Sequence, residues 1–443
     1  MNRILILGGG KSSTFLIDYL ADQASSKNRH VVLADLDVEL AKRKLKGKAN
    51  TEAKALDIGD ENARRQLIKE ADVVISMLPA RMHPQVAVDC LEHGKHFFSA
   101  SYESKEMRQM EAQIREKGLF FLNECGLDPG IDHMSAKKII DQVKANQGEI
   151  LSFKSFAGGL LSPECEDNPW KYKFTWNPRN VVLAGQGMSR YIEQSKLKYI
   201  PYHQLFKRAV KVSFDELGDF EGYPNRDSLA YRKLYGLENI PTMLRGTLRR
   251  TGFTKAWDVL IELGLTDDSI ELNPPSTSTK RDFLNSFLPF DPERSVEEKL
   301  SSYIPDMDFP TFEKIQWLGL FSHDPLPIYQ GSPAQILQAI LEKEWTLKAD
   351  DRDMIVMQHQ FEIKENNSTR KLISSLVVKG ENSDHTAMAK TVGLPLAIAV
   401  DLFLEGEIQL SGLHLPIIPE IYLPILDRLA DYGIHFDEKV LEN

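Results

Sequence analysis

A glycine-rich turn near the start of the chain constrains the fold more than any other feature of the sequence. Gly8, Gly9 and Gly10 lie between a short apolar segment, residues 3–7, and an amphipathic segment. A strand, a tight glycine turn and a helix in this order are typical of a dinucleotide-binding fold, whose helix N-terminus offers free N–H groups to a pyrophosphate. Ser13 stands where this motif usually has Gly or Ala, and three glycines could also form an ordinary surface turn.

After this turn, strand-like segments alternate with helical segments as far as residue 122. Strands are predicted at residues 30–34, 53–56, 72–76, 96–99 and 119–122, and helices at 39–46, 61–70, 84–93 and 106–117. Such alternation is typical of a parallel, doubly wound sheet. The sequence therefore predicts a Rossmann-type α/β domain, and it contains no P-loop motif.

The alternation ends after about residue 124. Residues 150–190 mix glycine, proline and aromatic residues, and 200–330 contain short helical segments broken by prolines. Residues 354–363 and 371–378 alternate as antiparallel strands do, and an apolar helical segment follows at 386–404. With 443 residues, and about 150 residues per domain, about three domains are expected.

The composition excludes several classes of protein. Apolar residues make up 42% and charged residues 27%, which argues against wholesale disorder. Lys and Arg number 54 against 64 Asp and Glu, a net charge of −10, so nucleic acid and anionic membranes are not expected as partners. The cysteines Cys90, Cys125 and Cys165 have no metal-ligand spacing. A metal site is therefore not expected. No apolar run approaches the roughly 18 residues of a membrane span, so a cytoplasmic protein is expected.

Five motifs, in order along the chain, carry a resemblance to a known family. They are Asn123–His133 (NECGLDPGIDH), Tyr172–Arg179 (YKFTWNPR), Tyr223–Ser228 (YPNRDS), Leu244–Arg249 (LRGTLR) and Thr386–Pro395 (TAMAKTVGLP). They resemble the GLDPGIDH, YKFSWSPR, PNRDS, LRGTLR and SAMAxTVGxP elements of the glutamate-forming saccharopine dehydrogenases, also called saccharopine reductases. Matching segments run from residue 4 to about residue 432, so the resemblance covers nearly the whole chain.

The resemblance implies an oxidoreductase of lysine metabolism that interconverts saccharopine with L-glutamate and α-aminoadipate semialdehyde, using NAD or NADP. It also implies a homodimer and a fold of three parts. These are a dinucleotide-binding domain (1–125 with 385–443), an α+β substrate and dimerisation domain (126–200 with 331–384) and a mainly helical insertion (201–330). The direction of the reaction stays open, since synthesis and breakdown of lysine use the same site.

The resemblance also assigns site residues. Those implied for cofactor binding are Gly8, Gly10, Lys11, Ser12, Asp35, Asp57, Ile58, Ser76 and Leu78, and those for substrate binding are Pro79, Ser101, Tyr102, Leu127, Asp128, Lys173, Phe174, Arg226, Thr247 and Arg249. Saccharopine carries three carboxylates, and guanidinium groups bind carboxylates through paired hydrogen bonds. The alternative for each arginine, Arg179 included, is a structural ion pair. The bulky segment from Lys173 to Trp176 could equally belong to the core.

Asp128 is the candidate catalytic residue. It lies on a turn just past a predicted strand, at the edge where ligands of open α/β sheets bind. A carboxylate there can hydrogen-bond a substrate ammonium or relay a proton at the imine. The alternative is an Asx turn or a helix N-cap before Ile131. Imine reduction asks the protein mainly to orient the cofactor, so an indispensable base need not exist. His133 and Cys125 are weaker acid–base candidates.

Asp35 favours NAD over NADP. It ends the second predicted strand, 25 residues after Gly10, where a carboxylate accepts hydrogen bonds from the ribose hydroxyls of NAD. The 2′-phosphate of NADP would meet a like charge there. The alternative is that Asp35 caps the next helix while Lys42, Arg43 or Lys44 folds back to bind the phosphate.

Two other functions stay open. A reductase of the carboxynorspermidine dehydrogenase type would need an extra acidic group for a second amine, and fewer arginines. A non-catalytic dinucleotide-binding homologue would keep the fold without turning over semialdehyde and glutamate. The arginine-containing motifs at residues 223–228 and 244–249 favour the saccharopine reaction.

Overall fold

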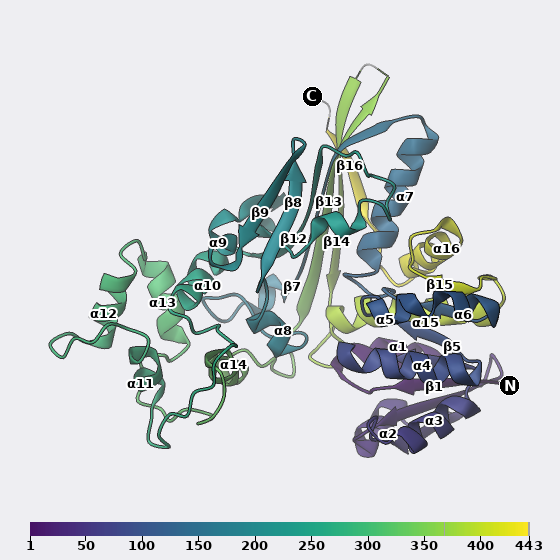
Figure 1. The fold of residues 1–443 in the computed structure, drawn as a ribbon, viewed down its shortest axis with the longest axis horizontal. Helices are drawn as coiled ribbons and strands as arrows, with labels where there is room; N and C mark the ends of the chain where they lie inside the picture. The colour runs from purple at the N-terminus through teal and green to yellow at the C-terminus, as the bar shows by residue number, and fades with distance from the viewer. Residues whose placement is uncertain (367, 442–443) are drawn as a thin grey trace. The chain divides into compact units, whose positions relative to one another are not determined.

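The chain forms two compact units in a computed structural model that describes residues 1–366 and 368–441 (Figure 1). The first unit contains Met1–Glu149, Lys364–Ser368 and Leu376–Lys439, and the second contains Ile150–Ile363, Thr369–Ser375 and Val440–Asn443. The predicted substrate and insertion regions thus lie largely together in the second unit, whereas residues 126–149 lie in the first. The division into three parts stays a prediction.

The first unit is built on a seven-stranded sheet of order β15-β6-β5-β4-β1-β2-β3, in which every neighbouring pair of strands is parallel. The predicted doubly wound sheet is therefore confirmed. Its strands are β1 (Asn2–Leu7), β2 (Arg29–Asp35), β3 (Thr51–Ala55), β4 (Val73–Ser76), β5 (His96–Ser99), β6 (Phe120–Leu122) and β15 (Gly412–His414).

Helices connect these strands, and some of them begin at a side chain that caps the helix N-terminus. Asp37 caps α2 by accepting the Leu40 N–H at 3.0 Å, and Asp60 caps α3 by accepting the Ala63 N–H at 3.1 Å. The one helix predicted at 106–117 is two helices that meet at Met110. The helices of the unit are α1 (Thr14–Gln23), α2 (Val38–Leu45), α3 (Glu61–Glu70), α4 (His83–His93), α5 (Lys105–Gln109), α6 (Glu111–Glu116), α7 (Ile131–Ala145), α15 (Ala387–Leu404) and α16 (Pro419–Ala430).

The strand order places the candidate site. Parallel strands end at the same edge of a sheet, so the loops after β1 to β6 gather there. The strand β1 lies between β2 and β4, and the order of the chain reverses at this point. Open α/β sheets bind their ligands at such a reversal. The apolar side chains of β1, β2 and β4 form the buried core beneath it.

The helix α15 corrects one expectation. It has 18 residues and is apolar and long enough to cross a membrane by length and composition, although no such run was expected from the sequence. In the structure 78% of this helix is buried, as in the core helix of a compact domain. Position 393 of this helix has to be glycine, because an added Cβ would lie 2.9 Å from the Leu16 backbone nitrogen. The helix therefore packs directly against the start of α1.

A nine-stranded sheet of mixed direction forms the centre of the second unit. Its main path is β10-β11-β12-β7-β13-β14-β16, and the hairpin of β8 and β9 adds to β12. The strand β12 runs parallel to β7 and antiparallel to β11. The strands are β7 (Glu149–Leu161), β8 (Met188–Glu193), β9 (Lys196–Pro201), β10 (Val210–Phe214), β11 (Gly218–Pro224), β12 (Thr242–Arg250), β13 (Asp353–Glu365), β14 (Ser368–Lys379) and β16 (Asp437–Leu441).

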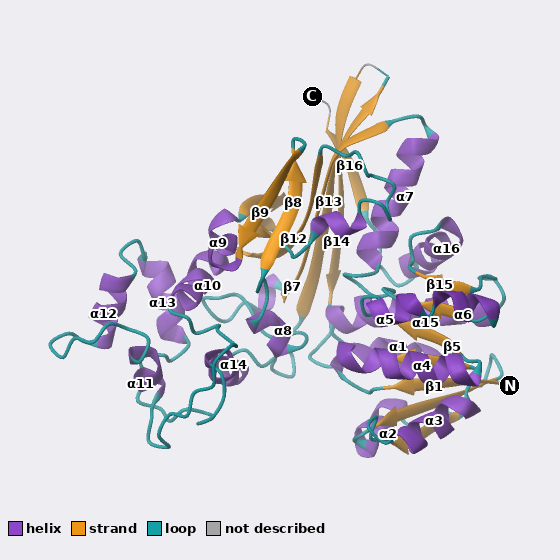
Figure 2. Cartoon of the chain, viewed as in Figure 1, coloured by secondary structure: helices purple, strands orange, loops and turns teal. Residues whose placement is uncertain are grey.

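Helices predominate in the second unit only between residues 253 and 344. The region predicted as a mainly helical insertion begins with the short helix α9 and continues with β10, β11 and β12, and Figure 2 shows short helices joined by long loops after them. Five aromatic side chains, Trp170, Tyr172, Phe253, Trp257 and Trp345, pack together in the core. The helices are α8 (Pro178–Val182), α9 (Tyr202–Leu205), α10 (Phe253–Glu262), α11 (Lys280–Asn285), α12 (Val296–Tyr303), α13 (Phe309–Trp317) and α14 (Pro333–Glu344).

Candidate active site

The glycine turn after β1 has the geometry that a dinucleotide needs. Gly8 has a φ of 100°, and an added Cβ would lie 2.9 Å from the Met77 carbonyl oxygen, so glycine is required there by the chain itself. An added Cβ on Gly10 would meet nothing within 4 Å. The chain's own packing therefore does not demand glycine at position 10, but a pyrophosphate approaching the backbone does. Ser13 is buried and its hydroxyl donates to the Gly10 carbonyl at 2.7 Å, so a polar contact holds the position where Gly or Ala was expected.

Asp35 lies beside this turn, at the end of β2. One carboxylate oxygen accepts the Gly9 N–H at 2.6 Å, and the other accepts the Asp37 N–H at 2.9 Å. Asp35 is not the cap of α2, because Asp37 fills that role. The next strand end carries Asp57, whose side chain accepts the Gly59 N–H at 2.8 Å. Ile58 follows it in the same loop and is half-buried.

The basic residues of α2 already have partners. Lys42 pairs with Glu39 at 2.7 Å, and Arg43 lies 3.9 Å from a carboxylate oxygen of Asp37. Lys44 does fold back, as the alternative above proposed. Its ammonium donates to the Gly10 carbonyl at 2.9 Å and to the Thr14 hydroxyl at 2.8 Å, and burial lowers its pKa. Lys11 and Ser12 directly follow the three glycines. Lys11 is exposed and Ser12 is half-buried.

The ends of β4 and β5 are joined by an imidazole that was not predicted from the sequence as a site residue. His83 begins α4, and its Nδ1 lies 2.8 Å from the Ser76 hydroxyl while its Nε2 lies 2.7 Å from the Ser101 hydroxyl. Its only sequence signal is a helix-starting Pro84 next to it. Leu78 is half-buried and Pro79 exposed in the loop between β4 and α4, and Tyr102 follows Ser101 with 41% of its surface exposed.

Asp128 stands out in the loop after β6. It is partly exposed, whereas its neighbours from Asn123 to Met134 are all buried, Leu127 included. The cap position of α7 is Gly130, so the N-cap alternative for Asp128 does not hold. Gly130 has a φ of 145° and approaches the Gly126 backbone so closely that any side chain would collide with it. This tight turn presents Asp128 at the carboxyl edge of the sheet.

The weaker acid–base candidates are packed into the interior behind this loop. His133 is fully buried, and its Nε2 lies 2.9 Å from a carboxylate oxygen of Glu124. Cys125 is fully buried, and desolvation raises the pKa of its thiol well above its usual range. A thiol with a raised pKa stays protonated, so it supplies no base at neutral pH.

In the second unit, the arginine motifs meet through the pairing of β11 and β12. Tyr223 lies opposite Thr247, and Glu221 lies opposite Arg249. Thr247 and Arg249 are two residues apart on one strand, so they share a face. Arg226 follows β11 in the left-handed region (φ 44°) and is exposed, and its guanidinium has no hydrogen bond or ion pair to any described residue. The loop therefore presents a free cation beside β12.

Arg249 is the most unusual charged residue of the unit. Only 4% of it is exposed, and its guanidinium donates to the Leu248 carbonyl and lies over the rings of Tyr172 and Phe253 at 5.1 and 5.4 Å. Within residues 1–366 and 368–441 it has no acidic partner, and its Nε lacks any hydrogen-bond acceptor. Its cross-strand neighbour Glu221 instead accepts N–H groups from Gly252 and Thr254, at the start of α10.

Three other side chains that were predicted to contact the substrate have partners within the protein. Lys173 is buried, and its ammonium pairs with Asp351 at 2.7 Å and Asp167 at 2.9 Å. Phe174 belongs to the aromatic core. Arg179 pairs with Asp268. These environments match the structural alternatives stated above. The assignment of Lys173 and Phe174 to substrate stays a prediction, and their packing does not favour it.

Comparison with known proteins decides the family. A model described as "Saccharopine dehydrogenase NADP binding domain" matches residues 4–122, and one described as "Saccharopine dehydrogenase C-terminal domain" matches residues 126–434. The chain belongs to the saccharopine dehydrogenase family. The resemblance carried by the five sequence motifs is therefore confirmed.

Individual members of the saccharopine dehydrogenase family match along the whole chain. A solved structure of "apo histidine-tagged saccharopine dehydrogenase (L-Glu forming)" from Saccharomyces cerevisiae is 33% identical, covers 100% of both chains and superposes with a TM-score of 0.90. The "Saccharopine dehydrogenase [NADP(+), L-glutamate-forming]" of Schizosaccharomyces pombe is 32% identical and covers 100% of both chains. The "Alpha-aminoadipic semialdehyde synthase" of Arabidopsis thaliana is 33% identical over 98% of this chain, which spans 44% of that longer protein.

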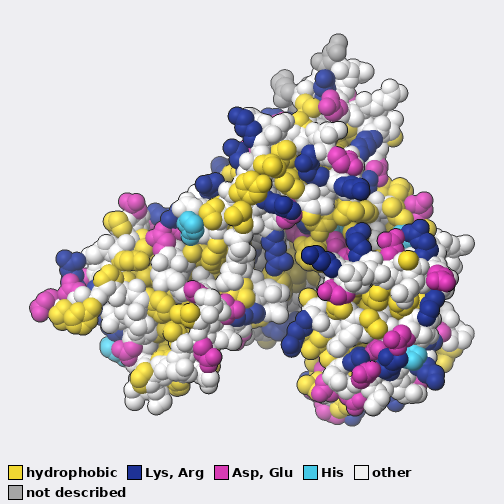
Figure 3. Space-filling model, viewed as in Figure 1, with side chains coloured by type: hydrophobic (Ala, Val, Ile, Leu, Met, Phe, Trp, Pro, Cys, Tyr) yellow, Lys and Arg dark blue, Asp and Glu magenta, His cyan; other side chains and the backbone are white. Residues whose placement is uncertain are grey.

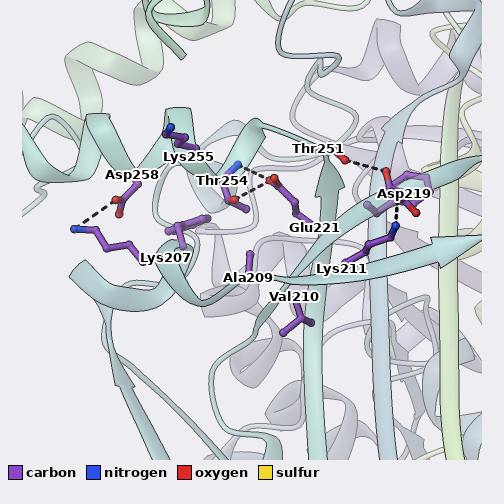
Figure 4. A pocket seen from close by; sticks show the side chains of 12 residues that line it. Lys207, Ala209, Val210, Lys211, Asp219, Glu221, Thr251, Thr254, Lys255 and Asp258 are labelled. Atoms are coloured by element: carbon purple, nitrogen blue, oxygen red, sulfur yellow. Dashed lines mark hydrogen bonds and ion pairs between the residues drawn. The ribbon is translucent and has the colours of Figure 1, made fainter. Parts of the chain in front are cut away.

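A separate pocket of the second unit does not fit the chemistry of this family. It has a volume of about 540 Å³ and lies among β10, β11 and α10 (Figure 4). The lysines that line it are paired with acidic residues, as Lys211 is with Asp219 at 2.6 Å and Lys255 is with Asp308 at 2.8 Å. Burial raises the pKa of Asp258 in this pocket to about 6. It contains none of the motif arginines.

Two further observations concern the rest of the molecule. Among the described residues, no three His, Cys, Asp or Glu side chains gather in a way that could hold a metal ion. On the face shown in Figure 3, basic and acidic side chains are interspersed with apolar ones. The predictions that nucleic acid and membranes are not partners of this chain are not tested by these observations.

Proposed function

We propose that this chain is an oxidoreductase that interconverts saccharopine with L-glutamate and α-aminoadipate semialdehyde, using a nicotinamide cofactor. The observation that carries the proposal is Arg249, a buried guanidinium with no acidic partner among the described residues. Leaving a charge buried and unpaired is costly, so such a site is built to receive an anion. Saccharopine has three carboxylates, and relatives that match over the full length are named for it.

The residues of the first unit fit a nicotinamide dinucleotide. The open space at Gly10 and the N–H groups at the start of α1 suit the pyrophosphate. The loops that carry Ser76 and Leu78 follow β4, next to the glycine turn, and suit the nicotinamide end. When bound, the cofactor supplies the hydride that reduces the imine formed from glutamate and the semialdehyde.

The chain's own residues then bind and orient the substrate. Arg226 and Arg249 each hold a substrate carboxylate through charge-assisted hydrogen bonds, and the Thr247 hydroxyl adds a neutral one. Asp128 accepts a hydrogen bond from the substrate amine and moves a proton at that nitrogen. The hydroxyls of Ser101 and Tyr102 contribute further hydrogen bonds. These are positioning and charge-balancing roles, which is what imine reduction requires of a protein.

We propose NAD(H) as the preferred cofactor, although the relatives and the family's first domain are named for NADP. The support is the fixed Asp35 carboxylate beside Gly9, together with the three basic residues of α2, which are already paired or hydrogen-bonded. A 2′-phosphate would meet an anion with no free cation of α2 to offset it.

The test of the reaction is a spectrophotometric assay. Purified protein is mixed with saccharopine and either NAD or NADP at alkaline pH, and the reduced cofactor is measured. Saccharopine-dependent reduction supports the proposal. Cofactor binding without any saccharopine-dependent reduction would show a non-catalytic homologue. Activity with a diamine and aspartate semialdehyde instead would show the carboxynorspermidine type of reaction, which no full-length relative described above is named for.

A cytoplasmic homodimer completes the proposal. The cysteines Cys90, Cys125 and Cys165 are free thiols among the described residues, as suits a reducing compartment. The dimer is proposed from the family resemblance alone, and light scattering of the purified protein tests it. A monomer at micromolar concentration would contradict it.

A further inference from the structure

The imidazole of His83 spans the ends of two neighbouring strands. Ser76 is the last residue of β4, and its register partner on β5 is Ser99, two residues before Ser101. His83 contacts the hydroxyls of Ser76 and Ser101 through its two ring nitrogens, and only 3% of its surface is exposed. The ring therefore uses both of its hydrogen-bonding atoms to join two side chains at the functional edge of the sheet.

The backbone fixes Ser101 from both sides. Its N–H donates to the Ser99 hydroxyl at 3.1 Å, and its carbonyl accepts the Glu124 N–H at 3.0 Å. The freedom that is left is the rotation of its hydroxyl, and His83 limits that rotation. Because the imidazole is the side-chain partner of this hydroxyl, it decides in which direction the hydroxyl hydrogen points.

The ring is neutral in this setting. Burial lowers the pKa of His83 to about 4, so at neutral pH it has one donor nitrogen and one acceptor nitrogen. With the hydrogen on Nδ1, Ser101 must donate to Nε2 and has no hydrogen left for a ligand. With the hydrogen on Nε2, the ring donates to Ser101, and Ser76 donates to Nδ1. The hydroxyl hydrogen of Ser101 is then free to reach an anion.

On the basis of the proposed function, we propose that His83 is a positioning residue that donates from Nε2 to Ser101, so that Ser101 donates its hydrogen to an anionic group of saccharopine. Neither the family resemblance nor the paired-carboxylate chemistry of the arginines assigns a role to this histidine. The tautomer is selected because a carboxylate accepts but cannot donate a hydrogen bond. A histidine that only tied β4 to β5 would be insensitive to the substrate.

A double-mutant cycle tests this role through the KM for saccharopine. In His83→Asn the shorter side chain retains the reach to Ser76 and loses the reach to Ser101, and KM is expected to rise by about tenfold. Ser101→Ala is expected to raise KM by a similar factor, and the double variant no further than Ser101→Ala alone. The cofactor's KM and kcat are expected to change by less than about threefold, because the interaction with Ser101 concerns substrate binding.

Matched variants separate positioning from structure. His83→Gln, whose longer amide reaches Ser101, is expected to restore most of the lost affinity. His93→Asn is the same substitution at the other end of α4, about 15 Å away, and is expected to leave KM unchanged. Two results would overturn the inference. One is a KM in the double variant that equals the product of the two single effects. The other is a His83→Asn variant that loses melting temperature without a change in the KM for saccharopine.

A measurement on the unmodified protein keeps the test independent of whether a variant folds. Nitrogen NMR of histidine-labelled protein reports which ring nitrogen carries the hydrogen, with the His83 signal assigned by its loss in His83→Gln or, if that fails to fold, by its unusually low pKa. Saccharopine is expected to leave Nε2 protonated and Nδ1 unprotonated, and the opposite tautomer would overturn the inference. Protein that binds cofactor but never turns over saccharopine would refute the proposed function instead.

Discussion

Two buried charges, one in each unit, are compensated in opposite ways. In the first, Asp401 is fully buried on α15, and Lys27, Arg29 and Arg428 all pair with its carboxylate, while the Tyr19 hydroxyl donates to it at 2.9 Å. In the second, Arg249 is almost as deeply buried, yet no acidic residue in the described chain pairs with its guanidinium. The first arrangement is complete without a ligand.

This difference distinguishes a structural charge from a binding charge. A buried ion stabilises a fold only when its neighbours compensate for the water it has lost. Asp401 has that compensation, so it joins α1, β2, α15 and α16 within one unit. Arg249 has only aromatic faces and one backbone carbonyl, so the fold bears the cost of its desolvation. A charge kept at a cost to stability indicates selection for binding.

The largest expected effect is on the stability of the first unit. Asp401→Asn leaves Lys27, Arg29 and Arg428 close together without their shared anion. The free energy of unfolding is expected to fall by about 3–5 kcal/mol, as when one partner of a buried ion pair is removed. Chemical denaturation measures this loss. Glu407→Gln is the control, because Glu407 pairs with the same Arg428 from a half-exposed position and is expected to contribute less than about 1 kcal/mol.

The pH dependence of this effect has a defined sign. Burial by itself raises the pKa of Asp401, but hydrogen bonds from Lys27, Arg29 and Tyr19 outweigh it, and the net pKa is lowered. A lowered pKa in the folded state means that the stabilisation is present above the unfolded value of about 3.9 and is lost as the pH falls through the folded value. The difference between wild type and Asp401→Asn should therefore shrink below about pH 4. A difference that grows there would contradict the assignment.

The next effect concerns the uncompensated charge itself. Arg249→Met keeps the length of the side chain and removes the guanidinium, so the KM for saccharopine is expected to rise about 10- to 150-fold, the equivalent of about 1.5–3 kcal/mol. The melting temperature should hold or increase, since an unpaired buried charge is removed. Steady-state kinetics and thermal unfolding measure both quantities.

The neighbouring arginine provides the matched control. Arg250 is also buried on β12, but it points to the other face and pairs with Glu166 at 2.6 Å. Arg250→Met is expected to lower the melting temperature and leave the KM for saccharopine unchanged. If the two variants lost stability alike, with no difference in KM, Arg249 would be an ordinary structural residue.

Arg226 gives a smaller effect of the same kind. Its guanidinium is exposed and unpaired among the described residues, so water screens it and weakens its contribution to binding. Arg226→Ala is expected to raise the KM for saccharopine by about tenfold with no change in cofactor affinity. Lys233→Ala, another exposed cation of the same unit, is the control for a general loss of positive charge. Equal effects from both variants would show long-range attraction rather than a direct contact.

The sequence was sufficient to predict most strands and helices of the first unit as far as residue 122, because their signals are local. The strand and helix periods, the glycine turn and the carboxylate of Asp35 each lie within a few residues of the feature that they predict. The sequence also pointed to Arg226 and Arg249 through their motifs. It could not separate these arginines from Arg179 or Lys173, because the partners Asp268 and Asp351 are far away along the chain and only folding brings them close.

His83 was missed for a similar reason. Its role depends on two serines from different strands, at positions 76 and 101, and no spacing in the sequence marks such a bridge.

The strands β10 to β12 were underestimated because the prolines at 201, 224 and 241 suggested short helices. Pro201 and Pro224 end strands in the structure, and Pro241 directly precedes one. Proline at a strand end is compatible with a sheet, since the lost N–H lies outside the regular pairing.

The smallest expected effect concerns the choice of cofactor. The preference for NAD proposed here differs from the NADP in the names of the relatives. The Asp35 carboxylate is fixed by the N–H groups of Gly9 and Asp37, and this geometry holds an acceptor ready for a ribose hydroxyl. Wild type is expected to have a higher kcat/KM with NAD than with NADP. Asp35→Ala should lower kcat/KM for NAD by about fivefold, the value of one hydrogen bond, and raise it for NADP. The ratio of the two values is the measurement, because loss of the Gly9 contact affects both cofactors equally.

Asp35→Asn separates the two causes, since it keeps a hydrogen-bonding side chain and removes the charge that repels a 2′-phosphate. Asp37→Ala is the control, because Asp37 caps α2 and its loss should reduce stability without changing the ratio. A wild-type preference for NADP, or a ratio that Asp35→Ala does not change, would place this chain with its NADP-named relatives and assign Asp35 to the turn alone.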